Sequence, residues 1–179
     1  MKILKNMTIA EIASIVSSTL EAAGITAVLS GGSVVSIYSE NEYESQDLDF
    51  ISPADKNKLA EVMYQIGFRK QNKYFAHPDT QYFVEFPASP LTIGHEYIPY
   101  KDCAVLQVGD GKIHLLTPTQ CVMDRLAAFY YWLDRQSLDQ ALMVGKRHVI
   151  DLRKVKSWSK KEGHLQKYDE FLENLWKPR

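Results

Sequence analysis

The residues best suited to chemistry lie in two short segments, Gly31-Gly32-Ser33 and Asp47-Leu48-Asp49, separated by thirteen residues. The glycine pair follows an apolar run that reads as a strand and precedes a short helix. Two glycines at such a junction let the backbone turn tightly and approach a ligand without interference from side chains. The unpaired amides that open the helix lie at its positive end, which suits phosphate. We therefore expect a phosphate-binding corner at Gly31-Gly32-Ser33, where Ser33 adds a hydroxyl.

Asp47 and Asp49 form an acidic pair on the next expected strand. Side chains two residues apart on a strand point to one face, about 6–7 Å apart. Leu48, Phe50 and Ile51 indicate that this strand is largely buried, where two like charges are unfavourable unless a cation lies between them. Carboxylate oxygens without nearby His or Cys suit Mg²⁺ or Mn²⁺ rather than zinc. The pattern predicts a divalent-metal site at this pair.

Hydrophobic periodicity and turn residues predict the elements that must position these groups. Helices are expected over 9–23, 33–38, 55–66, 118–133, 137–150 and 164–176, strands over 25–30, 46–51, 68–75 and 81–86, and a hairpin within 94–116. Thr8 with Glu11 has the pattern of a capping box, and Thr117-Pro118 marks a second helix start. The order predicts a mixed α/β domain over 1–116 and a helical C-terminal region over 117–179.

The succession of strand, Gly-Gly-Ser, short helix and a strand with Asp-x-Asp resembles the nucleotidyltransferase-like superfamily. Ser45-Gln46-Asp47-Leu48-Asp49 is similar to the Ser/Thr-x-Asp-Ile/Leu-Asp form of abortive-infection and minimal nucleotidyltransferases. The resemblance is specific over residues 28–50, moderate up to 86 and thin beyond 118. It implies an α/β (α+β) fold, in which a mixed sheet flanked by helices is followed by a helical region packed on it.

The resemblance also implies a third carboxylate on a later strand. Glu85 is the best match because it interrupts a β-type run, where a charge is otherwise costly. Asp79 is the alternative, although it follows His77-Pro78 in an expected turn. The sequence departs from many relatives at Glu42-Tyr43-Glu44, where they carry an arginine that contacts phosphate.

The helical half carries two candidate nucleotide-binding arginines. In abortive-infection toxins a basic residue on the first helix of this region reaches the nucleotide, and by position the candidates here are Arg125 and Arg135. The alternative interpretation is that they are surface arginines paired with Asp124 or Asp139. Both interpretations are compatible with the sequence.

The resemblance implies transfer of a nucleoside monophosphate from an NTP to an acceptor hydroxyl, with RNA or protein as the favoured acceptor. Gly31-Gly32-Ser33 would hold the β- and γ-phosphates, and Asp47, Asp49 and Glu85 would bind two Mg²⁺ or Mn²⁺ ions. Glu85 could also accept the proton of the acceptor hydroxyl. Two alternatives stay open: an antibiotic nucleotidyltransferase, or a non-catalytic member that binds a nucleotide or a partner, such as one half of a toxin–antitoxin pair.

Charge and composition add weaker expectations. The net charge of −1 is unevenly distributed. Residues 1–144 hold 11 basic and 17 acidic residues, a net charge of −6, whereas residues 145–179 hold 10 basic and 5 acidic residues, a net charge of +5. The basic region could contact nucleic acid or could be a solvated helical surface. The aromatic run 129–132 could stack on bases, although Phe129 falls on an apolar helix face and is expected in the core.

The remaining features predict a cytoplasmic protein that does not contact a membrane. The two cysteines, Cys103 and Cys121, form no CxxC pair and suit free thiols in a reducing compartment. The sequence shows no secretory signal and no apolar stretch long enough for a membrane span. The five histidines are scattered and indicate no zinc site. Oligomeric state has no signature in the sequence.

Overall fold

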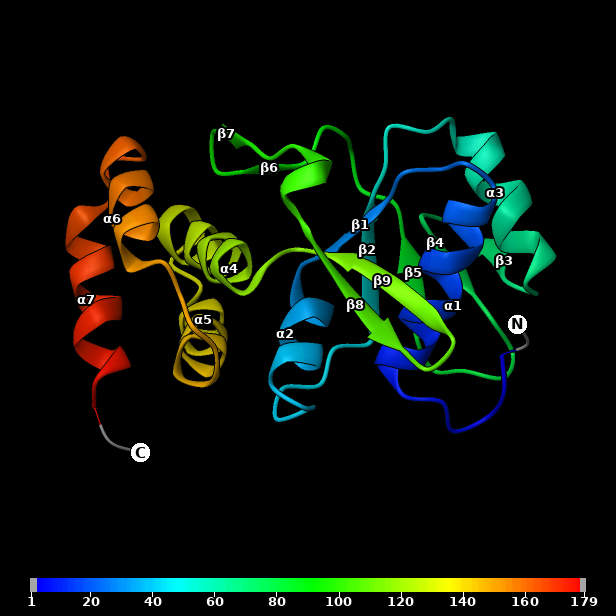
Figure 1. The fold of residues 1–179 in the computed structure, drawn as a ribbon, viewed down its shortest axis with the longest axis horizontal. Helices are drawn as coiled ribbons and strands as arrows, with labels where there is room; N and C mark the ends of the chain where they lie inside the picture. Colours follow the sequence, from blue (N-terminus) through cyan, green and yellow to red (C-terminus); the bar gives the residue numbers. More distant parts are fainter. Residues whose placement is uncertain (1–2, 178–179) are drawn as a thin grey trace.

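The computed structural model, which describes residues 3–177, contains a seven-stranded mixed sheet that joins a group of four helices (Figure 1). The sheet has the order β3-β4-β5-β2-β1-β9-β8. Its strands are β1 (Val28–Ser30), β2 (Asp47–Ile51), β3 (Arg69–Gln71), β4 (Tyr74–Ala76), β5 (Phe83–Glu85), β8 (Ala104–Val108) and β9 (Gly111–Leu115). A separate hairpin consists of β6 (Thr92–Ile93) and β7 (Glu96–Tyr97), and is followed by the 3-10 helix η1 (Tyr100–Asp102).

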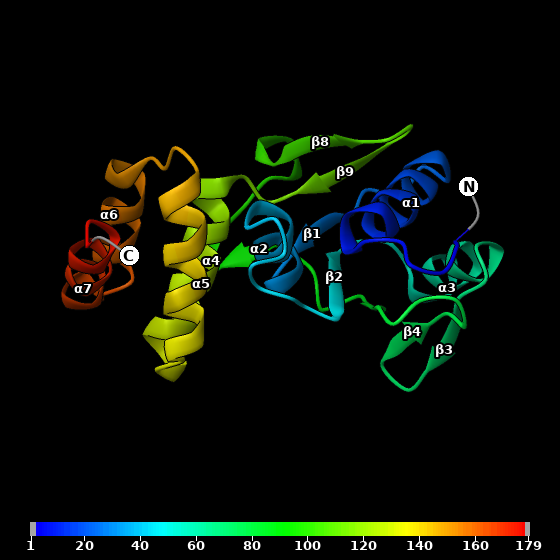
Figure 2. The same cartoon turned by 90° about the horizontal axis from the view of Figure 1, so that it is seen from below.

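Within residues 3–177, seven α-helices surround or extend this sheet. They are α1 (Ile9–Ala22), α2 (Gly32–Tyr38), α3 (Lys56–Gln65), α4 (Pro118–Trp132), α5 (Arg135–Arg147), α6 (Leu152–Lys161) and α7 (Leu165–Leu175). In Figure 2, α2 lies between the central strands and the α4–α5 pair, and α6 with α7 forms an outer layer beyond that pair. The expected fold class is confirmed: a mixed sheet flanked by helices, followed by C-terminal helices. None of the helices within residues 3–177 has the length and apolarity needed to cross a membrane.

The centre of the sheet is dictated by its most apolar strands. All three residues of β1 are buried, and Leu48 and Phe50 of β2 have no exposed surface. β1 pairs with β2 antiparallel and with β9 parallel, while β2 pairs with β5 parallel. Because apolar side chains occupy both faces at this point, these strands lie in the middle of the sheet. Their ends therefore bring chain segments far apart in sequence to one place.

The helical region begins where Thr117 caps α4. The Thr117 hydroxyl accepts a hydrogen bond from the Gln120 amide at 3.2 Å, and the Gln120 side chain accepts one from the Thr117 amide at 2.8 Å. This is a complete capping box, with Pro118 in the first helical turn as predicted. Further along, Trp158 of α6 is buried against Tyr130 and donates through Nε1 to the Ile93 carbonyl at 3.2 Å. The helices are thus connected directly to β6.

Two expectations about the elements are wrong. Residues 68–75 are not one strand: β3 and β4 form a hairpin that reverses at Asn72, whose φ is +55°. Asparagine tolerates this left-handed conformation better than most residues, and the surrounding polar residues concealed the turn. The expected loop between residues 150 and 164 contains α6. The many basic residues of α6 concealed the helical spacing of its buried residues Val155 and Trp158. Asp151 caps the helix, because its side chain accepts a hydrogen bond from the Lys154 amide at 3.0 Å.

The capping box at Thr117 gives a first prediction. Thr117→Ala removes the side-chain acceptor and leaves the Gln120 amide without it, so the free energy of unfolding should fall by about 1 kcal/mol. Thr117→Ser retains the hydroxyl and should lose much less. Urea unfolding of the three proteins measures both differences. Equal stability of the alanine variant and the unchanged protein would contradict the role of the cap.

Candidate functional site

The glycine corner lies against the Asp49 carboxylate. Gly31 is the N-cap of α2 and has φ +72° and ψ −155°, a region that is accessible essentially to glycine only. A Cβ at Gly31 would lie 2.7 Å from Asp49 Oδ2, closer than nonbonded atoms approach. The Ser33 side chain is fully buried, and its hydroxyl donates to the Ser30 carbonyl at 3.0 Å. Ser33 therefore stabilises the turn, while its contact with phosphate stays a prediction.

Strand register aligns the three predicted carboxylates. In the β1–β2 pair Ser30 is opposite Asp49, and in the β2–β5 pair Asp49 is opposite Glu85. Asp47 is exposed two residues before Asp49 on the same strand. Glu85, whose side chain is 20% exposed, forms an ion pair with Lys73 at 3.1 Å. Glu85 thus lies on a later strand, as the resemblance implies, and the register places it opposite Asp49. Lys73 is a charged neighbour that the sequence did not indicate.

The electrostatics of Asp49 reflect this crowding. Burial raises the pKa of Asp49 to about 6 from an ordinary 3.8, and the negative charges of Glu85 and Asp47 act in the same direction. The positive charge of Arg125 opposes them. A carboxylate whose ionised form is disfavoured by burial and by two like charges would gain from a bound cation. The three side chains fit a magnesium site in their chemistry, because all their donor atoms are carboxylate oxygens.

A closed metal cluster is not preformed. Across residues 3–177, no group of three or more His, Cys, Asp or Glu side chains is arranged to hold a metal ion. Magnesium in nucleotide sites commonly uses one or two carboxylates together with water and substrate phosphates. Binding of Mg²⁺ or Mn²⁺ by Asp47, Asp49 and Glu85 therefore stays a prediction.

A cleft of about 230 Å³ lies beside the Asp49 carboxylate. It joins the end of β1, strand β2, the segment that follows β5, and the face of α4. Its lining residues are Ser30, Gly31, Asp49, Ile51, Pro87, Ala88, Pro90, Leu91, Thr92, Asp124 and Arg125. The structure thus places Gly31, Asp49 and Arg125 around one hollow. The contribution of the segment after β5 could not be read from the sequence, since it has no periodicity and no charged residue between 87 and 92.

The two predicted arginines differ in position. Arg125 lines the cleft and is held there by Asp124, whose Oδ2 accepts from Arg125 Nε at 3.0 Å and Nη2 at 2.5 Å. The ion pair with Asp124 that the alternative interpretation expected is present, although the Arg125 side chain is only 18% exposed. A contact between Arg125 and a nucleotide stays a prediction. Arg135 is not brought to the cleft: its side chain is 65% exposed and its guanidinium pairs with Glu170 of α7 at 2.6 Å. Its predicted nucleotide contact receives no support from this position.

The fold can be compared with known proteins. No protein-family model and no curated protein matches the sequence. The structure is similar to an antigenic nucleotidyltransferase-like protein from Paracoccidioides brasiliensis, with a TM-score of 0.60 and 15% identity over 96% of this chain and 88% of that chain. The chain has the nucleotidyltransferase-like fold. It is also similar to ANT(2")-Ia in complex with adenylyl-2"-tobramycin, with a TM-score of 0.50 and 10% identity over 92% of this chain and 97% of that chain.

The close approach at Gly31 predicts a large cost for a side chain there. Gly31→Ala must adopt an unfavourable backbone conformation and also displace the Asp49 carboxylate, so unfolding free energy should fall by about 3 kcal/mol. Gly109→Ala is the matched control, because Gly109 has φ +57° but open space where a Cβ would be placed. It should lose only about 1 kcal/mol. Equal losses in urea unfolding would show that the contact with Asp49 does not matter.

The raised pKa of Asp49 predicts a pH dependence of stability in buffer containing EDTA. Because the folded pKa of about 6 exceeds the ordinary 3.8, the folded protein binds this proton more tightly than the unfolded chain does. The resulting stabilisation is complete below pH 3.8 and is lost as the pH rises through 6. Two pK units correspond to about 3 kcal/mol. Asp49→Asn should therefore become more stable than the unchanged protein above pH 6, by up to this amount.

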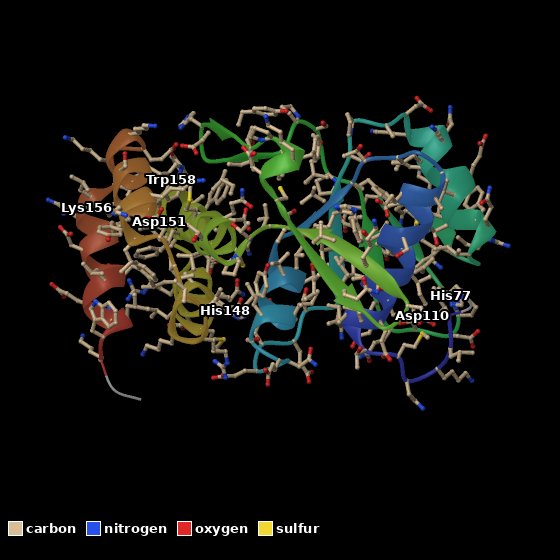
Figure 3. The ribbon with its side chains drawn as sticks, in the orientation of Figure 1. His77, Asp110, His148, Asp151, Lys156 and Trp158 are labelled. Carbon is tan, nitrogen blue, oxygen red and sulfur yellow. The ribbon has the colours of Figure 1, made fainter. Side chains whose placement is uncertain are left out.

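Urea unfolding at several pH values between 4 and 8 measures this difference. Asp110→Asn is the control, because Asp110 is exposed at the tip of the β8–β9 hairpin, far from the helical region (Figure 3). Its stability should follow that of the unchanged protein across the range. An advantage of Asp49→Asn that is independent of pH would refute the assigned pKa.

Proposed function

We propose that the chain is a nucleotidyltransferase that moves a nucleoside monophosphate from an NTP to an acceptor hydroxyl, with RNA or protein as acceptor. The observation that carries the proposal is the cleft in which Gly31, Asp49 and Arg125 converge. A backbone corner without side chains can accommodate phosphates, a carboxylate can hold the metal that accompanies them, and a fixed arginine can stabilise their charge. Their arrangement on a nucleotidyltransferase-like fold favours this chemistry over other uses of an acidic cleft.

In this proposal each group has a distinct task. The corner at Gly31 and Gly32 accommodates the β- and γ-phosphates, and Arg125, oriented by Asp124, lies beside the α-phosphate. The acceptor oxygen forms a bond to the α-phosphorus while the bond to the bridging oxygen breaks, and pyrophosphate leaves. Glu85 takes the proton of the acceptor hydroxyl. Asp47, Asp49 and Glu85 would hold Mg²⁺ or Mn²⁺, which when bound supplies charge neutralisation for the phosphates and activation of the acceptor hydroxyl.

A small polyhydroxylated acceptor is a second candidate. It is favoured by the similarity to ANT(2")-Ia, whose complex contains an adenylylated tobramycin. The same transfer would then modify an antibiotic instead of a macromolecule. The two acceptor classes use the same NTP half of the site and differ only in what receives the nucleotide.

The proposal is tested by incubating the protein with Mg²⁺ and each α-labelled NTP, in the presence of RNA, protein or aminoglycoside. Labelled acceptor should form, and Asp47→Asn and Asp49→Asn should each lower the rate by about 100-fold or more, because each removes a carboxylate that would hold the metal ion. Asp110→Asn provides the matched control and should leave the rate unchanged. Removal of divalent ions with EDTA should abolish transfer.

Two outcomes would count against the proposal. Labelled product that forms equally well in Asp49→Asn would exclude the assigned site. Saturable NTP binding without labelled product, for any acceptor class, would favour a non-catalytic nucleotide-binding protein of this fold.

A further inference from the structure

A second and larger cavity continues the cleft along α4. It has a volume of about 540 Å³ and lies between α4 and the turn that joins β6 to β7. It shares Thr92, Asp124 and Arg125 with the cleft beside Asp49. Its other lining residues are Gly94, His95, Ala127, Ala128, Tyr131 and Trp132. The two hollows therefore adjoin along a shared wall, with charged residues at that wall and aromatic residues at the far end of the larger one.

The α4 wall of this cavity has an unusual composition. Arg125, Ala128 and Trp132 follow each other at intervals of three and four residues, so they share one helix face. Seven residues of helix separate Arg125 from Trp132, which is about 10 Å along the axis. Trp132 is 77% exposed, although packing normally covers most of a tryptophan. Ala128 lines the same cavity, and the Tyr131 ring stands edge-on to the indole at 6.3 Å between ring centroids.

The buried Glu162 fixes the two walls relative to one another. Its side chain is only 3% exposed, and its carboxylate accepts from the His95 backbone amide at 3.0 Å. The His95 ring Nδ1 lies 2.8 Å from Oε2, to which the Tyr131 hydroxyl also donates. A Cβ at Gly94 would lie 2.6 Å from that same oxygen. One carboxylate thus binds the β6–β7 turn on one side and α4 on the other.

We propose that this cavity binds a nucleobase stacked on Trp132, and that Glu162 is the positioning residue that holds its walls in place. Flat aromatic ligands stack on exposed indole rings without requiring a particular base. The volume lies within the range of small-molecule pockets. The inference rests on the proposed function, because the base site adjoins the cleft in which the NTP phosphates are proposed to bind at Gly31. The base can belong to the NTP or to a nucleic-acid acceptor.

Separate probes test the two halves of the site. Adenosine, guanosine, cytidine and uridine probe the aromatic end, and inorganic tripolyphosphate with Mg²⁺ probes the charged end, with binding followed by calorimetry and tryptophan fluorescence. Trp132→Ala should weaken nucleoside binding by about 10-fold or more, a typical loss for one stacked base, and should leave tripolyphosphate binding unchanged. Trp132→Phe should retain most of the affinity. Trp176→Ala is the control, since Trp176 is 71% exposed elsewhere, directly after α7.

These probes separate failure of the inference from failure of the proposed function. Tripolyphosphate binding without nucleoside binding, or nucleoside binding that is equal in Trp132→Ala, overturns the base site and leaves the proposed function standing. Nucleoside binding that depends on Trp132, without tripolyphosphate binding, supports the base site and contradicts the proposed triphosphate site.

Glu162→Gln tests the positioning role and identifies the source of the base. The glutamine amide has the size of the glutamate side chain but lacks the negative charge that interacts with the His95 amide, the His95 ring and the Tyr131 hydroxyl. If the base belongs to the NTP, KM for the NTP should rise by about 10-fold, with a smaller change in kcat. If it belongs to the acceptor, KM for the acceptor should rise instead. A loss of thermal stability with neither KM changed would show that Glu162 is only structural and would overturn its assigned role.

Discussion

One constraint dominates the candidate site: the pairing of the central strands holds negatively charged side chains close together. β1, β2 and β5 pair so that Asp49 lies opposite Glu85 and directly beside the Gly31 corner, while Asp47 precedes it on the same strand. Burial and the neighbouring acids disfavour the ionised form of Asp49, as its raised pKa shows. The apolar strands must compensate for that unfavourable interaction. Leu48 and Phe50, which alternate with the two aspartates, have no exposed surface and anchor β2 in the core.

The helical region contributes side chains to the cleft beside Asp49. α4 supplies Arg125 and Asp124 to the cleft, and its position is set by contacts with the rest of the chain. α5 packs on α2, the helix that begins at the glycine corner, so the corner and the helical pair are placed relative to each other. Trp158 connects α6 to β6 through a buried hydrogen bond. These contacts fix α4 relative to the acidic strands. From the sequence, the boundary between residues 1–116 and 117–179 was visible only as a change from mixed to helical elements.

Local features were predictable from the sequence, whereas the tertiary partners of charged residues were not. The Gly31 turn, the pair Asp47–Asp49 and the start of α4 follow from short-range rules of backbone conformation and capping. Glu85 could be singled out because the resemblance implies a third carboxylate on a later strand, and Glu85 is a charge that interrupts a β-type run. Arg135 could not be placed: it pairs with Glu170, thirty-five residues later, and no spacing rule connects the two. Glu162 and Lys73 were missed for the same reason.

The charge of the cleft determines what kind of ligand it can accept. Of the charged residues that line the cleft, Asp49 and Asp124 outnumber Arg125, which is already paired with Asp124. Asp47 and Glu85, the neighbours of Asp49 on β2 and β5, add negative charge, and Lys73 is already paired with Glu85. A bare triphosphate would add negative charge to this excess and be repelled. A triphosphate that carries a divalent cation would instead relieve the repulsion among the acids. The proposed affinity for nucleotide therefore requires the cation, while the adjoining aromatic cavity, which lacks this excess of acids, is where an uncharged base can contribute without one.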